Sequence, residues 1–325
     1  MNKVDLKSAK NILILRSEGS LGDTVLTSCY YRELKKANPN LKISVVCFGA
    51  AYAYLRKIKY IDKIYRLPVR RVLRPHQKWL TLMFFGLKLG LKRFDFILDD
   101  NPKPQKNWYF FRAFLGEERI FDSSVLKETP VISQQRTKMM LDAMGLKNAS
   151  INYDIPLEEQ CEKRLKDFLT EKSIKTYIAF NVFSSVLHRS LSADNIAFIA
   201  ECIKKYAPET NVILPVMPSM KEELTQRLTG CSLDFIVYET QSVFDLFSLL
   251  NSSFFVISPD TAAVHIATGF GKAGIFLYPK GITFCAAENP AAAVIKAPDE
   301  DMNNFDRGEF SSAFLNLVGQ NKDNI

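Results

Sequence analysis

The sequence lacks the cysteine and histidine patterns that mark metal sites and disulfide-stabilised folds. Six cysteines are scattered through 325 residues, and the chain has three histidines. No two cysteines have the spacing of a zinc or redox motif, so buried free thiols are the expected state. A structural zinc site is therefore not expected.

Long apolar runs are also absent. No stretch approaches the roughly 20 apolar residues of a membrane span, since the longest candidate, residues 79–91, is interrupted by Lys88. The charged N-terminus is followed by an apolar segment, residues 12–15, that is far too short for a signal peptide. We therefore expect a cytoplasmic protein.

Glycine and proline are modest in number, at 14 residues each, and no repeat or low-complexity segment is evident. With 47% hydrophobic and 24% charged residues, the composition is that of an ordinary globular protein. The length allows about two domains that each bury a core. The polar stretch 148–156 predicts the boundary, with domains at residues 1–155 and 156–325.

Charge is unevenly divided between the halves. Residues 1–150 contain 28 Lys and Arg against 13 Asp and Glu, a net charge of +15, whereas residues 151–325 carry −7. Twelve basic residues and one acid, Asp62, lie between Arg56 and Arg93. This asymmetry indicates an anionic partner for the first half, and nucleic acid, an acidic glycolipid and a membrane surface all qualify. Nucleic acid is least favoured, because aromatic residues do not interleave with the basic ones in a stacking pattern.

One stretch organises the second half of the chain. An apolar run, residues 254–257, ends in Ser258-Pro259-Asp260-Thr261, and small and apolar residues follow at helical spacing. This pattern predicts a buried strand, a tight turn, and a helix whose first backbone N–H groups are available to an anion. Asp260 and Thr261 either cap this helix or reach a ligand.

The first half opens with a similar unit. A continuous apolar strand, residues 11–15, precedes a glycine-containing turn, a helix over residues 23–36 and a second strand. Gly19 and Gly22 have G-x-x-G spacing, which matches neither the dinucleotide fingerprint nor a P-loop. Asp23 is either an acid in the first helical turn or a general base at the carboxyl end of the first strand.

Strands and helices alternate along both halves, which is typical of doubly wound α/β domains. Further strands are expected at residues 58–67, 94–100, 119–121, 177–182, 211–215, 235–238 and 273–278, with helices at 79–91, 134–144, 161–170, 192–205, 221–228 and 243–250. Asp99 and Asp100 end a strand without a third metal ligand in view, so we expect structural or solvated roles for them. Residues Trp79–Phe85 either face the core, which is favoured, or enter a membrane interface.

The two turns together resemble those of the ADP-heptose:lipopolysaccharide heptosyltransferases, glycosyltransferase family nine. The first motif reads Arg16-Ser17-Glu18-Gly19-Ser20-Leu21-Gly22-Asp23, and the second reads Asp260-Thr261-Ala262-Ala263-Val264-His265-Ile266-Ala267. The resemblance implies a GT-B architecture, with two facing Rossmann-like domains and a cleft between them. It also implies an inverting, metal-independent transfer of heptose from ADP-heptose to an inner-core lipopolysaccharide acceptor made of Kdo, heptose and lipid A.

The resemblance implies a role for individual residues. Asp23 would deprotonate the acceptor hydroxyl. The donor would be held by Ser184, Ser185, His188, Arg189, Glu222, Asp260, Thr261, Ala262 and Ala263, with Glu223 nearly as well placed as Glu222. Ser20 and the basic residues Arg66, Arg70, Arg71 and Arg74 are the expected acceptor-binding residues, because the acceptor carries phosphates and carboxylates.

No cofactor or metal is expected, and the expected partners are a nucleotide sugar and an anionic glycolipid at the cytoplasmic face of the inner membrane. The last helix is a candidate to pack back on the first domain. Two departures concern the donor: Ala262 replaces a family glycine, and Arg189-Ser190-Leu191-Ser192 lacks the family's Trp-Pro. The alternatives are a GT-B transferase or epimerase that uses another nucleotide sugar, and a non-enzymatic binder of an anionic polymer.

Overall fold

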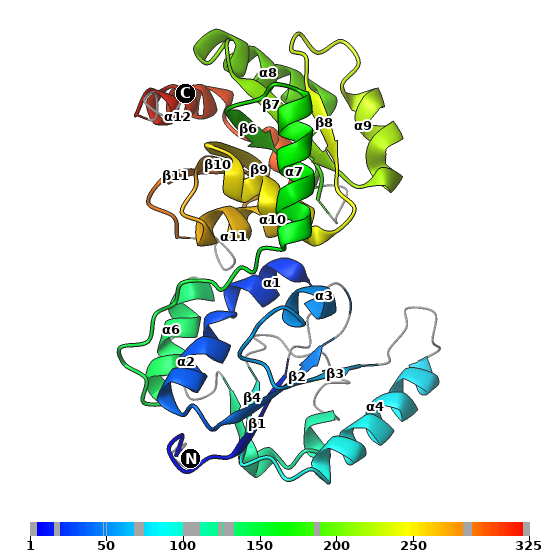
Figure 1. Ribbon diagram of the computed structural model, residues 1–325, viewed down its shortest axis with the longest axis vertical. Coiled ribbons are helices and arrows are strands. Elements are labelled where there is room, and N and C mark those ends of the chain that lie inside the picture. The colour runs from blue at the N-terminus through cyan, green and yellow to red at the C-terminus, as the bar shows by residue number, and fades with distance from the viewer. Residues whose placement is uncertain are drawn as a thin grey trace. The chain divides into compact units, whose positions relative to one another are not determined.

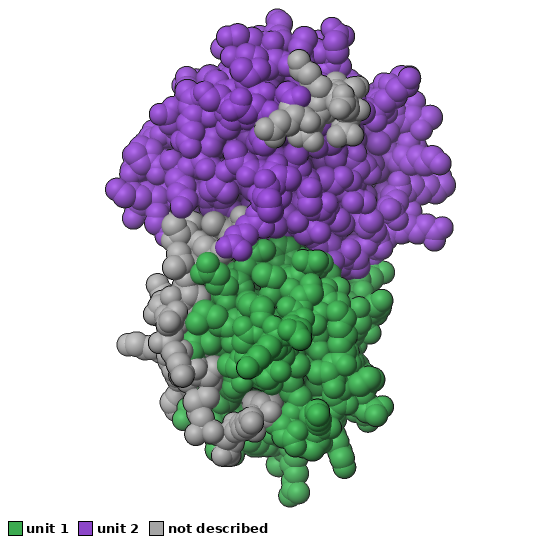
Figure 2. Space-filling model, turned by 90° about the vertical axis from the view of Figure 1, so that its left-hand side faces the viewer, with its two compact units in different colours: residues 1–154 green, residues 155–325 purple. Residues whose placement is uncertain are grey.

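The chain divides into two compact units, residues 1–154 and 155–325 (Figure 2). The computed structural model describes residues 5–15, 20–47, 49, 51–67, 75–99, 111–122, 126, 133–184, 189–281 and 288–320. Among these residues, no helix is both long enough and apolar enough to cross a membrane.

Unit 1 is built on a five-stranded parallel sheet with the strand order β3-β2-β1-β4-β5 (Figure 1). The strands are β1 (Asn11–Leu15), β2 (Lys42–Cys47), β3 (Lys63–Arg66), β4 (Phe96–Asp99) and β5 (Ile120–Asp122). The helices are α1 (Leu21–Leu26), α2 (Cys29–Ala37), α3 (Ala51–Leu55), α4 (Pro75–Gly90) and α6 (Ser133–Ala143), with a 3₁₀ turn at Glu117–Arg119. The central strand β1 is buried along almost its whole length, as its unbroken apolar sequence predicts.

The single helix expected over residues 23–36 is wrong, because the chain forms α1 and α2 with a break at Thr27 and Ser28. The Ser28 hydroxyl donates to the Val25 carbonyl oxygen at 2.6 Å and accepts the Asp154 N–H at 2.8 Å. The Thr27 hydroxyl donates to the Asp23 carbonyl oxygen at 3.2 Å. Hydroxyls that bond to nearby backbone groups compete with the regular helical ladder, which explains the break.

Unit 2 contains a six-stranded parallel sheet with the order β11-β10-β9-β6-β7-β8. Its strands are β6 (Tyr177–Phe180), β7 (Asn211–Val216), β8 (Ile236–Glu239), β9 (Phe255–Pro259), β10 (Ala273–Tyr278) and β11 (Ala292–Lys296). Its helices are α7 (Glu159–Glu171), α8 (Ala193–Tyr206), α9 (Lys221–Arg227), α10 (Val243–Ser252), α11 (Ala262–Gly269) and α12 (Arg307–Gln320), with 3₁₀ turns at Pro218–Met220 and Met302–Asn304. The last helix, α12, packs against α8, β10 and β11 of this unit and buries Phe310 and Phe314 in its core.

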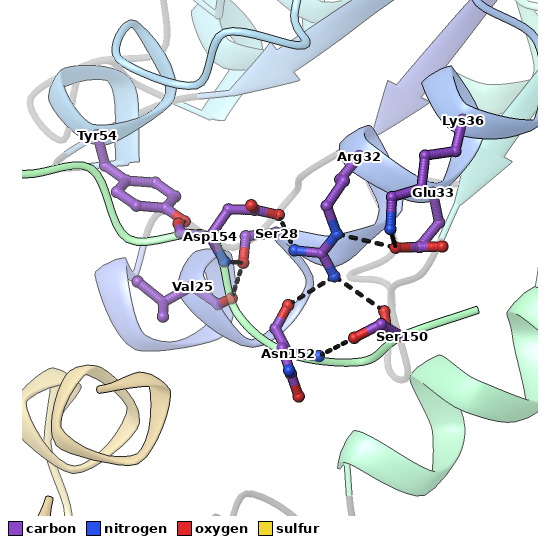
Figure 3. A network of polar contacts seen from close by, with 9 residues as sticks. All are labelled: Val25, Ser28, Arg32, Glu33, Lys36, Tyr54, Ser150, Asn152 and Asp154. Atoms are coloured by element: carbon purple, nitrogen blue, oxygen red, sulfur yellow. Dashed lines mark hydrogen bonds and ion pairs between the residues drawn. The ribbon is translucent and has the colours of Figure 1, made fainter. Parts of the chain in front are cut away.

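The end of unit 1 is fastened to α2 by a charged network (Figure 3). The Arg32 guanidinium contacts the carboxylates of Glu33 at 2.8 Å and Asp154 at 2.6 Å. It also donates to the carbonyl oxygens of Ser150 and Asn152 at 3.0 and 2.9 Å. Burial of the Glu33 carboxyl opposes its ionisation, but hydrogen bonds from Lys36 and Arg32 outweigh this effect and lower its pKa.

We expect Arg32→Met to destabilise unit 1 by about 2 kcal/mol, because it leaves two carboxylates and two carbonyl oxygens without their shared donor. Chemical denaturation followed by circular dichroism measures this loss. Arg119→Met is the matched control, since Arg119 pairs at 3.4 Å with Glu118, whose side chain is exposed, and should cost less than about 0.5 kcal/mol. Equal losses in the two variants would contradict the assigned role of Arg32.

Candidate functional site

The described residues of both predicted motifs, 20–23 and 260–267, follow strands beside which the strand order of a sheet reverses. In unit 1 the chain proceeds from β1 outward through β2 and β3, then returns to the other side of β1 with β4 and β5. In unit 2 it proceeds from β6 through β7 and β8, then returns with β9, β10 and β11. Open parallel sheets bind ligands at the carboxyl ends of the strands at such a switch point. The segments after β1, β6 and β9 carry the predicted residues.

Thr261 begins the turn-to-helix junction after β9. Its side chain accepts the Ala263 N–H at 3.2 Å, so Thr261 is the N-cap of α11. The N–H of Ala262, at the first helical position, has no hydrogen-bond partner among the described residues. Capping and ligand binding are therefore compatible at this turn, since one side chain caps the helix while a backbone donor stays available.

Asn181 ties the loop after β6 to the loop after β9. Its side-chain amide lies 3.1 Å from each of three acceptors, the Ser258 hydroxyl, the Thr261 hydroxyl and the Phe183 carbonyl oxygen. The hydroxyls of Ser258 and Thr261 lie 3.1 Å from each other. Asn181 and Ser258 are both buried. The sequence interpretation missed Asn181, although a polar residue directly after a buried strand is a usable signal at a switch point.

A cation lies beside this turn. Arg189 Nη1 is 3.1 Å from Asp260 Oδ2, and Asp260 is buried whereas the Arg189 side chain is one-third exposed. Asp260 thus neutralises part of the guanidinium charge and orients it, while the remaining Arg189 N–H groups are available as donors. Such an arrangement suits an anion at the N-terminus of α11.

The loop that carries Arg189 is stabilised by a hydrogen bond between two of its own residues and by contacts with Arg227. The Ser184 N–H donates to the Ser190 hydroxyl at 2.9 Å, and Ser190 is buried. The guanidinium of Arg227 lies 5.2 Å from the centre of the Phe183 ring and also donates to the Leu191 carbonyl oxygen. The predicted donor-binding residues Ser185 and His188 lie outside the described residues.

The two candidates for a ribose contact differ in their surroundings. Glu223 forms an ion pair with Arg227 at 2.6 Å, one helical turn along α9. Glu222 is exposed and has no ion pair or hydrogen bond among the described residues. Helix α9 follows β7, which neighbours β6. Of the two glutamates, Glu222 is therefore the one whose carboxylate is available to a ligand near the carboxyl ends of these strands.

In unit 1, Ser20 is the N-cap of α1, and its hydroxyl contacts Asp23 in the first turn. The Asp23 N–H donates to the Ser20 hydroxyl at 3.2 Å, and that hydroxyl in turn contacts the Asp23 carboxylate. Asp23 is half-buried. Asp23 lies in the first turn of α1, as the first of its two interpretations expects, while the base interpretation stays a prediction.

The basic segment is only partly described, since Arg70, Arg71 and Arg74 lie outside the described residues. Arg66 ends β3, and its guanidinium lies 5.1 Å from the centre of the Tyr52 ring, which Arg56 also approaches at 5.7 Å. Lys63 and Lys92 likewise approach Tyr65, at 5.3 and 5.8 Å. These contacts pair basic side chains with tyrosine rings within unit 1.

Asp99 is fully buried and pairs with Arg112 at 3.2 Å, and Arg112 also contacts Asp122 at 2.6 Å. This pairing agrees with the structural role expected for Asp99, while Asp100 lies outside the described residues. In the described part of the chain, no three His, Cys, Asp or Glu side chains form a group that could hold a metal ion.

Comparison with known proteins places these features in context. No family model matches the chain. It is 23% identical over 299 residues to the Escherichia coli K12 protein named "Putative lipopolysaccharide heptosyltransferase 4", an alignment that covers 86% of this chain and 77% of that protein. A solved family-nine glycosyltransferase from Veillonella parvula superposes with a TM-score of 0.79 at 14% identity, covering 98% of this chain and all of the other. The chain has the GT-B fold.

Two further GT-B relatives extend the comparison. Escherichia coli heptosyltransferase II superposes with a TM-score of 0.66 at 14% identity, covering 96% of this chain and 99% of the other. Escherichia coli heptosyltransferase WaaC, solved with ADP, superposes with a TM-score of 0.61 at 16% identity, covering 96% of this chain and 98% of the other. The resemblance to heptosyltransferases that the two motifs predict is thereby confirmed, and these relatives are glycosyltransferases.

We expect Asn181→Ala to destabilise unit 2 by about 1–2 kcal/mol, because three buried or half-buried acceptors lose their donor. Asn211→Ala is the matched control, since Asn211 begins β7 and its side chain has no hydrogen bond in the described structure. Denaturation curves of the two variants provide the measurement. A loss for Asn181→Ala no greater than for Asn211→Ala would show that Asn181 does not hold the two loops together.

Proposed function

We propose that this protein is an inverting, metal-independent glycosyltransferase that moves heptose from ADP-heptose to an anionic inner-core lipopolysaccharide acceptor. The observation that carries the proposal is the turn after β9, where Thr261 caps α11 beside the Asn181 amide and the Arg189–Asp260 pair. Its support is the position of this turn at the switch point of a sheet in a chain with the fold of the heptosyltransferases.

The donor diphosphate would lie against the start of α11. As the glycosidic bond breaks, negative charge develops on the diphosphate, and fixed N–H donors with a neighbouring guanidinium stabilise that charge. The available N–H of Ala262 and the exposed part of Arg189 are the groups suited to this task. Asp260 would orient Arg189 and contact the donor sugar, and Glu222 would bind the ribose.

Asp23 of unit 1 would act as the general base that takes the proton from the acceptor hydroxyl. Ser20, whose hydroxyl contacts the Asp23 carboxylate, would orient it. Arg66, with Arg70, Arg71 and Arg74, would supply positive charge toward acceptor phosphates and carboxylates. We place the enzyme at the cytoplasmic face of the inner membrane, where such an acceptor is presented.

A second candidate keeps the GT-B fold and uses another nucleotide sugar. The observation behind it is Ala262 at the position of a family glycine, a change within the motif expected to hold the donor. A solved structure from Listeria monocytogenes, described as a "putative UDP-N-acetylglucosamine 2-epimerase", superposes with a TM-score of 0.56 at 9% identity, covering 96% of this chain and 88% of the other. Melting temperatures with ADP-, UDP- and GDP-sugars distinguish the donor classes, since a bound nucleotide stabilises the fold.

We expect Asp23→Asn to lower heptose transfer about 10²–10⁴-fold, because an amide cannot accept the hydroxyl proton. The affinity for ADP, measured by calorimetry, should be unchanged, since the donor site lies in unit 2. Transfer from ADP-heptose to a Kdo-containing lipid A acceptor gives the rate.

Asp142→Asn is the matched control, because Asp142 is an aspartate of the same unit that pairs with Lys138 on the partly exposed side of α6. Its turnover should equal that of the wild type. Wild-type turnover in Asp23→Asn would reject Asp23 as the base, and a melting-temperature rise with UDP-sugars alone would reject ADP-heptose as the donor.

A further inference from the structure

Helix α4 is apolar on two opposite faces. Its inner face packs into the core of unit 1, where Leu82, Phe85 and Leu89 join a cluster that includes Leu13 and Phe111. The rings of Phe85 and Phe111 are stacked with their centres 6.2 Å apart. This face satisfies the core-facing interpretation of residues 79–85, but it does not account for the whole helix.

Two glycines fix the rotation of α4 about its axis. A Cβ atom on Gly86 would lie 3.1 Å from Phe114 Cβ, and one on Gly90 would lie 2.3 Å from the Phe114 carbonyl oxygen. Residues 86 and 90 are one helical turn apart and therefore on the same side of the helix. Close backbone approach along this line fixes the rotation of α4 against the segment that contains Phe114.

The outer face carries an exposed apolar stripe, which we define as Leu80, Phe84, Leu87 and Leu91. Their exposed fractions are 42%, 64%, 44% and 85%. The spacing of four, three and four residues aligns them along one line of the helix and its C-terminal extension. Single exposed apolar residues are ordinary, but an aligned set on the outer face of a surface helix departs from the polar face expected there. Figure 1 shows α4 at the periphery of unit 1.

The charged residues of α4 and its C-terminal extension have one sign. Lys88, Lys92 and Arg93 are exposed at its C-terminal end, and residues 75–93 contain no Asp or Glu. Trp79, at the other end, is 38% exposed. Apolar and aromatic residues beside basic ones are the composition of helices that lie in the boundary between lipid headgroups and acyl chains.

We propose that α4 docks unit 1 on the surface of an anionic lipid bilayer, with the apolar stripe in the acyl boundary and Lys88, Lys92 and Arg93 on lipid phosphates. A second copy of the chain is a poorer occupant of this face. A two-fold contact through the stripe would pair two segments that each carry basic residues, with no acid in residues 75–93 of either copy to compensate. The lipid surface supplies the missing negative charge. This proposal stands independently of the proposed transfer reaction.

Vesicle co-sedimentation of the full chain tests the proposal. We expect binding to phosphatidylcholine vesicles that contain phosphatidylglycerol, and much weaker binding to pure phosphatidylcholine vesicles. Phe84→Ser and Leu87→Ser should each lower the partition coefficient on the order of tenfold, because each removes an inserted apolar side chain. Their melting temperatures should stay at the wild-type value, since both side chains are exposed.

Leu315→Ser is the matched control, because Leu315 is a half-exposed leucine on α12 of the other unit, and it should bind vesicles as the wild type does. In a Trp108→Phe background, Trp79 is the sole tryptophan, and brominated lipids should quench its fluorescence. Absence of binding, or equal binding by Phe84→Ser and the wild type, would overturn the proposal. Sedimentation showing a dimer that Phe84→Ser dissociates would instead assign the stripe to self-association.

Discussion

The candidate donor site depends on one buried amide. Asn181 donates to acceptors on both loops at the β6–β9 switch point, and so fixes the Thr261 hydroxyl at the start of α11. A side-chain amide can do this because it presents two N–H donors from a single rigid group. Without it, the Ser258 and Thr261 hydroxyls would have only each other and local backbone groups as partners. The Arg189–Asp260 pair then adds oriented charge to a turn whose backbone is already fixed.

The two units place their candidate functional residues at the same position of the sheet, but the residues differ. Each places its first strand in the interior of the sheet, so that the strand order reverses beside it and carboxyl-end loops meet there. In unit 2 the loops carry an amide, hydroxyls and a guanidinium, which suit a phosphate. In unit 1 the corresponding helix start carries the contact between Ser20 and Asp23, and the buried Asp99 at the end of β4 pairs with Arg112. The chemistry expected of the second unit is anion binding, and that of the first is proton transfer and acceptor binding.

Much of this architecture could be predicted from local sequence. Continuous apolar runs such as residues 11–15 mark strands buried on both faces, and the strand-turn-helix at residues 254–267 gave the position of α11. The break between α1 and α2 could not be predicted, because it depends on the contact of Ser28 with Asp154, 126 residues away. For the same reason the amide of Asn181 and the tyrosine contacts of Arg66 escaped prediction. The exposed stripe on α4 could not be predicted either, because its exposure depends on how Gly86 and Gly90 pack against Phe114.

The central claim is that the start of α11 holds the donor diphosphate, and a crystal structure with bound ADP tests it most directly. The account predicts phosphate oxygens within hydrogen-bond distance of the Ala262 N–H and the Thr261 hydroxyl, with Arg189 on the same phosphates. Thr261→Val, which keeps the shape of the side chain and removes its hydroxyl, should weaken ADP binding about tenfold. A diphosphate bound away from α11, or unchanged ADP affinity in Thr261→Val, would contradict it.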